Sequence, residues 1–304
     1  MTVQALLSYA LIVPEIDAGR RFYSTFGLVP GERDDVLVLR CDGRDQDQVF
    51  LVEGKSKQLH HLRFGADDVG LANIRTRMRE RDVAETRAPA IRAFYGGFWL
   101  TDPDGNFVNV RNEHTRPWRR ASKKFDINQP GLYSRFHRGC PPRRQVRPTR
   151  LGHVLLFTPD LSRLVDFYIG VLGLRLTDSV PGIIAFLHLP TGGDHHVLAL
   201  VQDARPGFHH ASFEVESPDD IGLGAQTVLN AGYRNGWGFG RHVLGSNFFH
   251  YVRDPWMSMA EYFCDIDQVP ADGSWQAREY PPEDALYLWG PPVPEDFVRN
   301  FEGQ

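Results

Sequence analysis

The chain has 304 residues and a net charge of -4 at pH 7, and 42% of its residues are hydrophobic and 24% charged. This composition is typical of a soluble globular protein, and the length suffices for two domains that each have a core. The small acidic net charge provides no general attraction to nucleic acid. No apolar run approaches the ~20 residues that a membrane-spanning helix needs, and the N-terminus lacks the basic and apolar segments of a secretory signal. We therefore expect a cytoplasmic protein without nucleic-acid or membrane partners.

The three cysteines indicate neither a disulfide framework nor a thiolate zinc site. Cys41, Cys140 and Cys264 lie far apart in the sequence and form no CxxC pair. We interpret them as ordinary buried or semi-buried thiols.

The first 113 residues are predicted to alternate short strands with two helices. A β-branched and leucine-rich run over Ala5 to Val13 predicts a buried strand, and a helix fits Asp17 to Phe26, with Asp17 as its N-cap and Gly27 as its C-terminal stop. A second helix fits Val69–Arg81, and the turn signal Asp102-Pro103-Asp104-Gly105 separates the last two strands. The further strands are expected at Val36–Arg40, Gln48–Val52, His60–Phe64, Phe98–Thr101 and Phe107–Arg111.

The same order of elements restarts at residue 151. A strand over Gly152–Phe157 is followed by a helix over Leu161–Val171, which Gly173 closes. Matches between the two halves fall at two constant offsets, which is hard to obtain by chance. The offset is 145 for Phe22-Tyr23 against Phe167-Tyr168 and Pro14 against Pro159, and 152 for Asp67–Leu71 against Asp219–Leu223 and Asp102-Pro103 against Asp254-Pro255. The repeat predicts an α+β fold of two tandem modules, each made of paired βαβββ units that form a half-open barrel domain.

The repeat divides the chain into four expected segments, 1–113, 114–150, 151–267 and 268–304. Segment 114–150 contains eleven Lys or Arg residues and one Asp. It is either a patch that steers an anionic partner or, in the interpretation that we favour, a solvated connection between the modules. The tail from residue 268 is rich in Trp, Tyr and Pro, so we expect it to pack on the second module.

Three matching positions of the two modules could bind a metal, and the modules differ at two of them. The second module has His153, His210 and Glu261 on three predicted strands, whereas the first module has Ser8, His61 and Asn109. A lone histidine is more often a hydrogen-bonded polar group than a ligand, but a carboxylate inside the apolar strand around Glu261 is costly unless a charged group or a metal meets it. Two imidazoles and one carboxylate are typical of non-haem Fe(II) sites. We therefore predict a metal in the second module and none in the first.

Two pairs of adjacent histidines, His195-His196 and His209-His210, each pose a choice. Neighbouring residues of a strand face opposite sides of the sheet, so the two rings of a pair point in different directions. Alignment of the duplicated strands gives His210 the role of ligand, and His209 either faces outward or supports the ligand from behind. The residues alone leave the choice between His195 and His196 open.

Several motifs between Leu151 and Phe263 occur in one order. They are Leu151-Gly152-His153, Asp194–Leu200, Phe208-His209-His210 and a closing signature of Gly240-Arg241-His242, Tyr251, Asp254-Pro255 and Glu261. With them the chain resembles the type I extradiol ring-cleaving dioxygenases of the vicinal oxygen chelate superfamily, and the resemblance covers both modules. Two positions depart from the family pattern, since His250 replaces an apolar residue and Met257 stands where Gly or Pro is usual.

The resemblance implies a metal centre and an acid–base residue. His153, His210 and Glu261 would hold Fe(II), or Mn(II) as in some members of the family. His196 would be the acid–base histidine above the metal, because an imidazole with an unperturbed pKa of about 6.5 can take and return a proton near neutral pH. The partners would be a small aromatic diol and O2, and the protein would be a homo-oligomer, as family members commonly are.

The resemblance also implies which residues contact the substrate. Tyr251 and His242 would reach its hydroxyl group, since a tyrosine hydroxyl can donate a hydrogen bond to a developing oxyanion. Phe186 and His188, on one predicted strand, would line the ring pocket together with parts of the tail.

We therefore predict an Fe(II)-dependent extradiol dioxygenase that cleaves a catechol-type ring in aromatic degradation and leaves both atoms of O2 in the product. One alternative is a hydroquinone or trihydroxylated substrate, for which the ligands would be alike. A second is a metal-free, ligand-sequestering binding protein, against which the complete ligand set argues. A third is a glyoxalase-like isomerase, which usually divides its ligands between modules, where Ser8 and Asn109 would be poor ligands.

Overall fold

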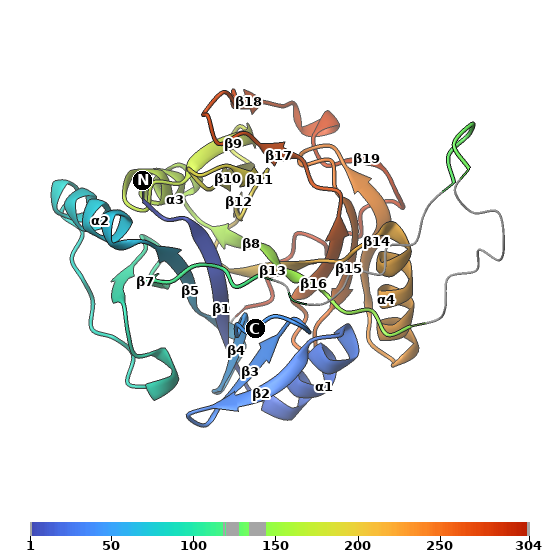
Figure 1. The fold of residues 1–304 in the computed structure, drawn as a ribbon, viewed down its shortest axis with the longest axis horizontal. Coiled ribbons are helices and arrows are strands. Elements are labelled where there is room, and N and C mark those ends of the chain that lie inside the picture. The colour runs from blue at the N-terminus through green and yellow to red at the C-terminus, as the bar shows by residue number, and fades with distance from the viewer. Residues whose placement is uncertain (1, 118, 120–127, 134–143, 303–304) are drawn as a thin grey trace.

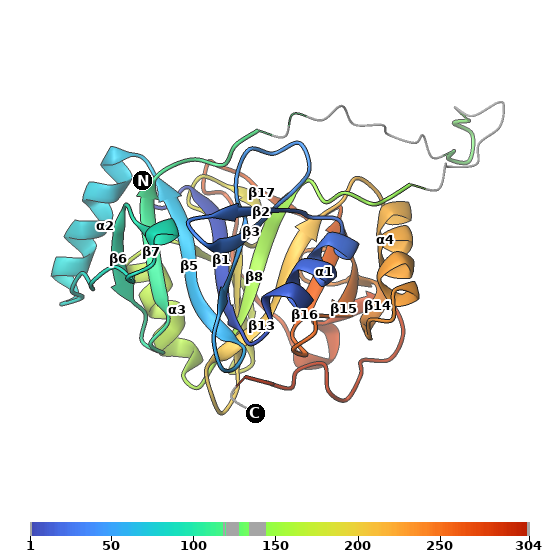
Figure 2. The same ribbon diagram turned by 90° about the horizontal axis from the view of Figure 1, so that it is seen from below.

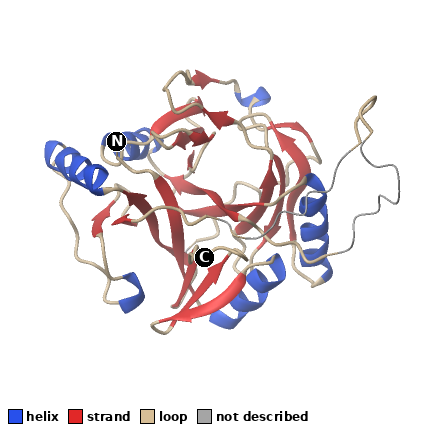
Figure 3. Ribbon diagram, viewed as in Figure 1, coloured by secondary structure: helices blue, strands red, loops and turns tan. Residues whose placement is uncertain are grey.

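The computed structural model describes residues 2–117, 119, 128–133 and 144–302, and its centre is made of two large sheets with helices on their outer faces (Figures 1 and 3). The first sheet has seven strands and the second has ten. The predicted α+β fold class with two sheet modules is confirmed. Within the described residues, no helix is both long enough and apolar enough to cross a membrane.

The first sheet has the strand order β2-β3-β4-β1-β5-β7-β6. At its centre β1 pairs antiparallel with β5, β4 runs parallel to β1, and β7 runs parallel to β5. The elements of this module are β1 (Ala5–Val13), α1 (Ile16–Phe26), β2 (Val29–Arg33), β3 (Val36–Arg40), β4 (Val49–Glu53), β5 (Gln58–Ala66), α2 (Asp68–Glu80), the 3-10 helix η1 (Arg92–Phe94), β6 (Phe98–Thr101) and β7 (Phe107–Asn112).

The second sheet repeats this plan around β8 and β13. Its order is β18-β9-β10-β12-β8-β13-β16-β15-β14-β19, with β12 parallel to β8 and β16 parallel to β13. The elements of this module are β8 (Arg150–Thr158), α3 (Leu161–Gly170), β9 (Arg175–Val180), β10 (Ile184–His188), β11 (Gly193–Asp194), β12 (Leu198–Gln202), β13 (Gly207–Glu214), α4 (Pro218–Asn230), β14 (Asn235–His242), β15 (Phe248–Arg253) and β16 (Met259–Cys264).

The tail adds short strands to the second module. Its elements are β17 (Gln268–Val269), β18 (Arg278–Glu279), the 3-10 helix η2 (Pro282–Asp284) and β19 (Tyr287–Trp289). Strand β18 pairs with β9 at one edge of the ten-stranded sheet, β19 pairs with β14 at the other, and β17 pairs with β11. The tail therefore lies along both edges of the sheet that carries the predicted ligands.

Two details of the first module differ from the sequence prediction. Glu15, and not Asp17, is the N-cap of α1, and Asp17 lies in the first turn, where a negative charge favours the helix dipole. Gly27 ends the helix with a φ of 107°, as predicted for a left-handed stop. The unit that begins with β5 has two strands after its helix in the described residues, one fewer than the general βαβββ plan; Thr86 makes one isolated bridge to Trp99.

Each module places its first helix against the other module. The Phe26 ring of α1 stacks on Tyr262 of β16 with ring centroids 3.9 Å apart, and the Tyr262 hydroxyl donates to the Phe26 carbonyl oxygen at 2.7 Å. In the reverse direction, Tyr168 of α3 donates from its hydroxyl to Asp102 Oδ2 at 3.1 Å, and its ring faces Phe64 of β5. One buried hydrophobic core therefore runs through both modules. Figure 2 shows α1 of the first module next to β16 of the second.

The described arginines at the end of segment 114–150 bind acidic groups of both modules. Arg147 lies 3.9 Å from Asp42 of the first module, and Arg144 lies 2.8 Å from Asp220 of the second. These ion pairs agree with a connection between modules, although most of the segment's basic residues, together with Cys140, lie outside the described residues. Cys41 and Cys264 are buried free thiols.

Candidate active site

The three predicted ligands come from three neighbouring strands of the second sheet, β8, β13 and β16. Ser212 of β13 pairs with His153 of β8 on one side and with Glu261 of β16 on the other. His210 lies two residues earlier in β13, and residues two apart in a strand face the same side of a sheet. The strand register therefore brings all three side chains to one face, around the small side chain of Ser212.

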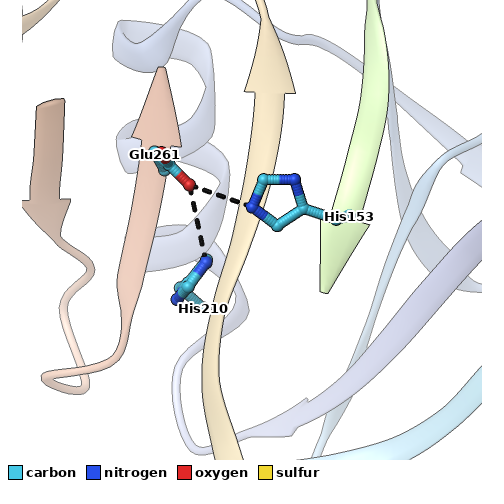
Figure 4. Close-up of side chains that lie close together, drawn as sticks. All are labelled: His153, His210 and Glu261. Carbon is cyan, nitrogen blue, oxygen red and sulfur yellow. Dashed lines mark hydrogen bonds and ion pairs between the residues drawn. The ribbon is translucent and has the colours of Figure 1, made fainter. Parts of the chain in front are cut away.

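These three side chains point toward one another (Figure 4). His153 Nε2 lies 3.2 Å and His210 Nε2 lies 3.5 Å from the same Oε2 atom of Glu261. One ligand atom of each residue lies within 4.8 Å of the other two, and all three residues are buried. In the described part of the chain, no other group of His, Cys, Asp and Glu side chains meets this condition.

The donor set fits a divalent metal ion. The Glu261 side chain has 0% exposure, and its ion-pair partners among the described residues are histidines, with no Lys or Arg among them. A buried carboxylate without a cation is costly. His210 Nε2 is also buried and makes no hydrogen bond to any described residue. An ion between the three atoms would balance the carboxylate charge and use the imidazole lone pairs.

In the first module, the three paired strand positions that match His153, Ser212 and Glu261 carry different side chains. Arg63 of β5 pairs with Ser8 of β1 and with Asn109 of β7, as Ser212 does between two ligands. Arg63 Nε donates to Asn109 Oδ1 at 3.0 Å, and burial lowers the pKa of Arg63 to about 9. His61 packs its ring against aromatic side chains. A large cationic side chain therefore stands at the position that the small Ser212 has in the second module.

His196 lies beside the ligands and makes a hydrogen bond to its neighbour in the sequence. Its ring centroid is 4.1 Å from that of His153, and its Nδ1 lies 3.0 Å from Nδ1 of His195. His195 in turn donates from Nε2 to Asp178 Oδ2 at 2.9 Å. Burial, reinforced by nearby histidines, lowers the pKa of His196 well below its usual value, so this ring is uncharged at neutral pH. Of the pair, His196 lines the cavity over the ligands, as its predicted acid–base role requires.

His242 and Tyr251 form a hydrogen-bonded pair next to Glu261. His242 Nδ1 donates to the carbonyl oxygen of Leu286 at 2.7 Å, because a carbonyl can only accept. Burial lowers the pKa of His242, so the uncharged ring accepts at Nε2 from the Tyr251 hydroxyl, 2.9 Å away. Burial and the Glu261 carboxylate raise the pKa of Tyr251 well above its usual value, so its hydroxyl keeps the proton. Leu286 belongs to the tail, which therefore orients His242.

An apolar cavity of about 200 Å³ lies over the ligands. Phe186 lines it as predicted, but His188 does not, and its Nδ1 lies 2.7 Å from the hydroxyl oxygen of Thr177. His188 is the last residue of β10 and pairs with Arg175 of β9. Further aliphatic wall residues, which sequence reasoning missed, are Leu155, Val180, Ile183, Ile184, Val201 and Leu244.

The tail supplies a second wall of the cavity. Its lining residues are Pro282, Ala285, Leu286, Phe297 and Val298. Asn247, also absent from the sequence prediction, lines the cavity and donates from Nδ2 to Glu261 Oε1 at 3.3 Å. The described lining residues include no Lys, Arg, Asp or Glu, so the cavity has an uncharged surface apart from the metal ligand set.

Residues 150–262 match the model of the Glyoxalase/Bleomycin resistance protein/Dioxygenase superfamily. Over 99% of its length the chain is 42% identical to metapyrocatechase 2 of Cupriavidus necator, of which it covers 93%. The chain belongs to the extradiol dioxygenases. This extradiol dioxygenase is also 35% identical to an iron-dependent extradiol dioxygenase of Rhodococcus jostii (strain RHA1), over 95% of its own length and 97% of that protein. The predicted family and enzyme class, an oxidoreductase that incorporates both atoms of O2, are confirmed.

A solved structure supports the fold of this extradiol dioxygenase. The Mn(II)-bound glyoxalase from Novosphingobium aromaticivorans aligns with a TM-score of 0.79 and 24% identity, over 96% of this chain and 93% of that one. At this identity the likeness concerns the fold alone. In this extradiol dioxygenase the three candidate ligands all come from the second module, whereas the isomerase alternative expected ligands from both.

Proposed function

We propose that this extradiol dioxygenase uses a divalent metal held by His153, His210 and Glu261 to open the ring of an uncharged catechol with an apolar substituent. The observation that carries the proposal is the buried set of two histidines and one glutamate at the base of an apolar cavity. A bound metal supplies Lewis acidity that lowers the pKa of the diol hydroxyls, and redox chemistry that couples the diol to O2.

We propose Fe(II) as the metal, with Mn(II) as the alternative. Histidine and carboxylate ligands bind both ions, so the donor set alone does not discriminate between them. The Rhodococcus jostii relative is named as iron-dependent, and the Novosphingobium aromaticivorans glyoxalase contains Mn(II). The higher sequence identity to the iron-dependent relative favours Fe(II).

The protein's own side chains would move the protons of the reaction. His196 is uncharged and lines the cavity beside the ligands, so it can accept a proton from a diol hydroxyl and later return it. The Tyr251 hydroxyl keeps its proton and also lines the cavity, where it can donate a hydrogen bond to a substrate oxygen that gains negative charge. His242, held by the Leu286 carbonyl, positions that hydroxyl.

The cavity wall favours an apolar substituent on the ring. The residues that surround the cavity beyond the histidines are mainly Leu, Ile, Val and Phe. A carboxylate or ammonium group placed there would lose its hydration without a charged partner. We therefore expect alkyl- or aryl-substituted catechols to be better substrates than catechols with a carboxylate side chain.

Metal removal and substrate comparison test the proposal. Dialysis against a chelator should abolish the yellow ring-fission product, and anaerobic addition of Fe(II) should restore it, with Mn(II) as a parallel arm. The substrate panel should contain catechol, methylcatechols, 2,3-dihydroxybiphenyl, trihydroxytoluene, hydroquinone and 3,4-dihydroxyphenylacetate. Full activity in the metal-free protein would refute the metal centre, and a kcat/KM highest for the carboxylated catechol would refute the substrate class.

The expected cytoplasmic location and homo-oligomeric state stay predictions. Light scattering during size-exclusion chromatography measures the second of these directly.

A further inference from the structure

The Nδ1 atoms of the adjacent histidines His209 and His210 lie only 2.6 Å apart. At this distance one nitrogen must donate a proton and the other must accept it. His210 is a proposed metal ligand, and a metal needs a lone pair on its Nε2. Which of the two Nδ1 atoms carries the proton therefore decides whether His210 is ready to bind the ion.

The tail determines where His209 carries its proton. His209 Nε2 lies 2.8 Å from the carbonyl oxygen of Phe297. A carbonyl oxygen only accepts, so Nε2 of His209 must donate. The His209 ring has 3% exposure and packs against the rings of Phe157 and Phe297, where a charge would be costly. The ring is therefore uncharged, with its one proton on Nε2 and a lone pair on Nδ1.

The His209 lone pair then fixes the proton on His210. Because Nδ1 of His209 can only accept, Nδ1 of His210 must be the donor in the contact between the rings. This leaves His210 Nε2 without a proton, and that atom faces Glu261 Oε2 at 3.5 Å. We propose that His209 is a positioning residue which, held by the Phe297 carbonyl, fixes His210 in the tautomer that binds metal through Nε2. The proposal rests on the proposed role of His210 as a ligand.

Side chains of the second module hold the Phe297 carbonyl in place. Arg253 donates to the carbonyl oxygen of Asp296 at 2.9 Å, and Asn300 donates to the carbonyl oxygens of Arg205 and Pro206 at 3.1 Å each. The residues on both sides of Phe297 are thus attached to the module that carries the ligands. The other ligand histidine has no comparable support, since Nδ1 of His153 is buried without a hydrogen bond to any described residue.

The first module offers a matched control. His60 and His61 also form an adjacent buried pair, with their Nδ1 atoms 2.8 Å apart. This pair lies in the module without the ligand set, so it shares the hydrogen bond but not the function. Substituting His209 in one pair and His60 in the other separates an effect on the ligand His210 from the general loss of stability on removing a buried histidine.

The experiment measures metal affinity in full-length His209→Leu, His209→Asn and His60→Leu variants. Chelator competition under anaerobic conditions gives the dissociation constant for Fe(II), and repetition with Mn(II) gives a redox-stable reading. His209→Leu removes the acceptor and should weaken binding by about ten- to hundredfold, the usual effect of losing a partner of a ligating histidine. His209→Asn places an amide oxygen near the former Nδ1 and should recover most of the affinity, while His60→Leu should leave it unchanged.

Nitrogen NMR of histidine-labelled wild-type protein reads the tautomer without any mutation. In the metal-free protein, His210 should carry its proton on Nδ1 and His209 on Nε2. A proton on His210 Nε2, or a dissociation constant in His209→Leu equal to that of wild type, would overturn the proposal. His210→Ala distinguishes the underlying function: if that variant binds metal as tightly as wild type, His210 is no ligand and the proposed metal centre itself is wrong.

Discussion

The two modules place the same strands in the same register around two very different centres. In the second module Ser212 is the middle one of three paired strand residues, and a histidine and a glutamate lie on either side of it. In the first module the central residue is Arg63, whose guanidinium contacts Asn109 and lies 4.8 Å from the ring centroid of Phe50. A small central residue leaves space for an ion, whereas a long cationic residue fills that space and brings a positive charge of its own.

The fold of a module does not depend on the ligand set. The first module forms a sheet of seven strands with a buried aromatic cluster, although a serine and an asparagine replace two of the ligands. His61 is the residue that the two modules still share at these positions, and its ring packs against Phe94 and Trp99. In one module the imidazole is a packing element, and in the other we propose that it binds a metal.

Removing the shared histidine from each module in turn is the strongest test of the proposed difference between the modules. We expect His210→Ala to lose the bound metal and all ring-cleavage activity while keeping its fold, because it removes one of three ligands. His61→Ala should keep both, with some loss of stability from the cavity that it leaves. Metal analysis, catechol turnover and circular dichroism of the two variants measure these effects. Metal retained by His210→Ala would show that the modules do not differ in the way proposed.

The residue two positions before β12, His196, provides a second comparison. His196→Gln should retain metal and substrate binding but slow turnover by about 10²–10⁴, the usual contribution of general acid–base catalysis. In the first module the residue at this register is Asp47, which forms ion pairs with Arg33 and Arg40. Asp47→Asn should therefore lower stability and leave kcat unchanged. Steady-state kinetics of both variants tests the difference, and normal turnover by His196→Gln would exclude the acid–base role.

Much of this fold was predictable from the sequence because the repeat shows the residue pattern of each strand and helix twice. Strands Val36–Arg40 and Phe98–Thr101 have the predicted bounds, since each is a short run of apolar residues next to a turn. Strand β2 was missed because Pro30 and Gly31 interrupt a segment that is mostly exposed and shows no alternation. The convergence of His153, His210 and Glu261 was predictable because aligned strands of a duplicated sheet keep their register.

The parts of the site that depend on distant contacts were not predictable. The hydrogen bond from His209 to the Phe297 carbonyl joins residues 88 positions apart, and no local pattern specifies such a pairing. The same holds for the Leu286 carbonyl that orients His242, 44 positions away. His188 was assigned to the ring pocket from the family resemblance, whereas in the structure it lies beside Thr177 and is not among the residues that line the cavity.

Glu302 makes contacts that connect the two modules, and a substitution can remove them. Its Oε1 accepts from Lys57 Nζ at 2.7 Å and from the backbone nitrogens of Leu59 and Phe208, so one carboxylate joins the first module, the tail and β13. Glu302→Ala leaves the buried Lys57 ammonium without its anion and should lower the free energy of unfolding by about 3 kcal/mol. Urea titration measures the loss. The exposed pair Arg75–Glu85 is the control, because Glu85→Ala should cost less than about 1 kcal/mol.

The smallest expected effect concerns acid stability of the first module. Burial, with Arg63 as the second cause, lowers the pKa of His60 to about 4, against about 6.5 in the unfolded chain. As the pH falls below 6.5, His60 becomes protonated in the unfolded chain, whereas in the folded chain it stays neutral until about pH 4. Protonation therefore favours the unfolded state, and the free energy of unfolding decreases from its value at pH 7. Between pH 7 and pH 4.5 the loss from His60 is about 2 kcal/mol.

His60→Leu should remove this share of the acid sensitivity. Urea titrations of metal-free wild type and His60→Leu at both pH values give the comparison, and the metal-free state excludes a loss of stability from acid-induced metal release. An equal loss of stability in the two proteins would show that His60 is as easily protonated in the folded chain as in the unfolded one.

The tail that completes the active site also follows the ligands in the order of synthesis. When Glu261 leaves the ribosome, all three candidate ligands have been made, but the cavity wall at residues 282–298 and the carbonyl that holds His209 have not. Because modules fold as units during synthesis, a nascent chain can build its sheet before its site is closed. The closed cavity and the support of His209 are thus properties of the finished chain, and a truncated translation product would have the three candidate ligands without either.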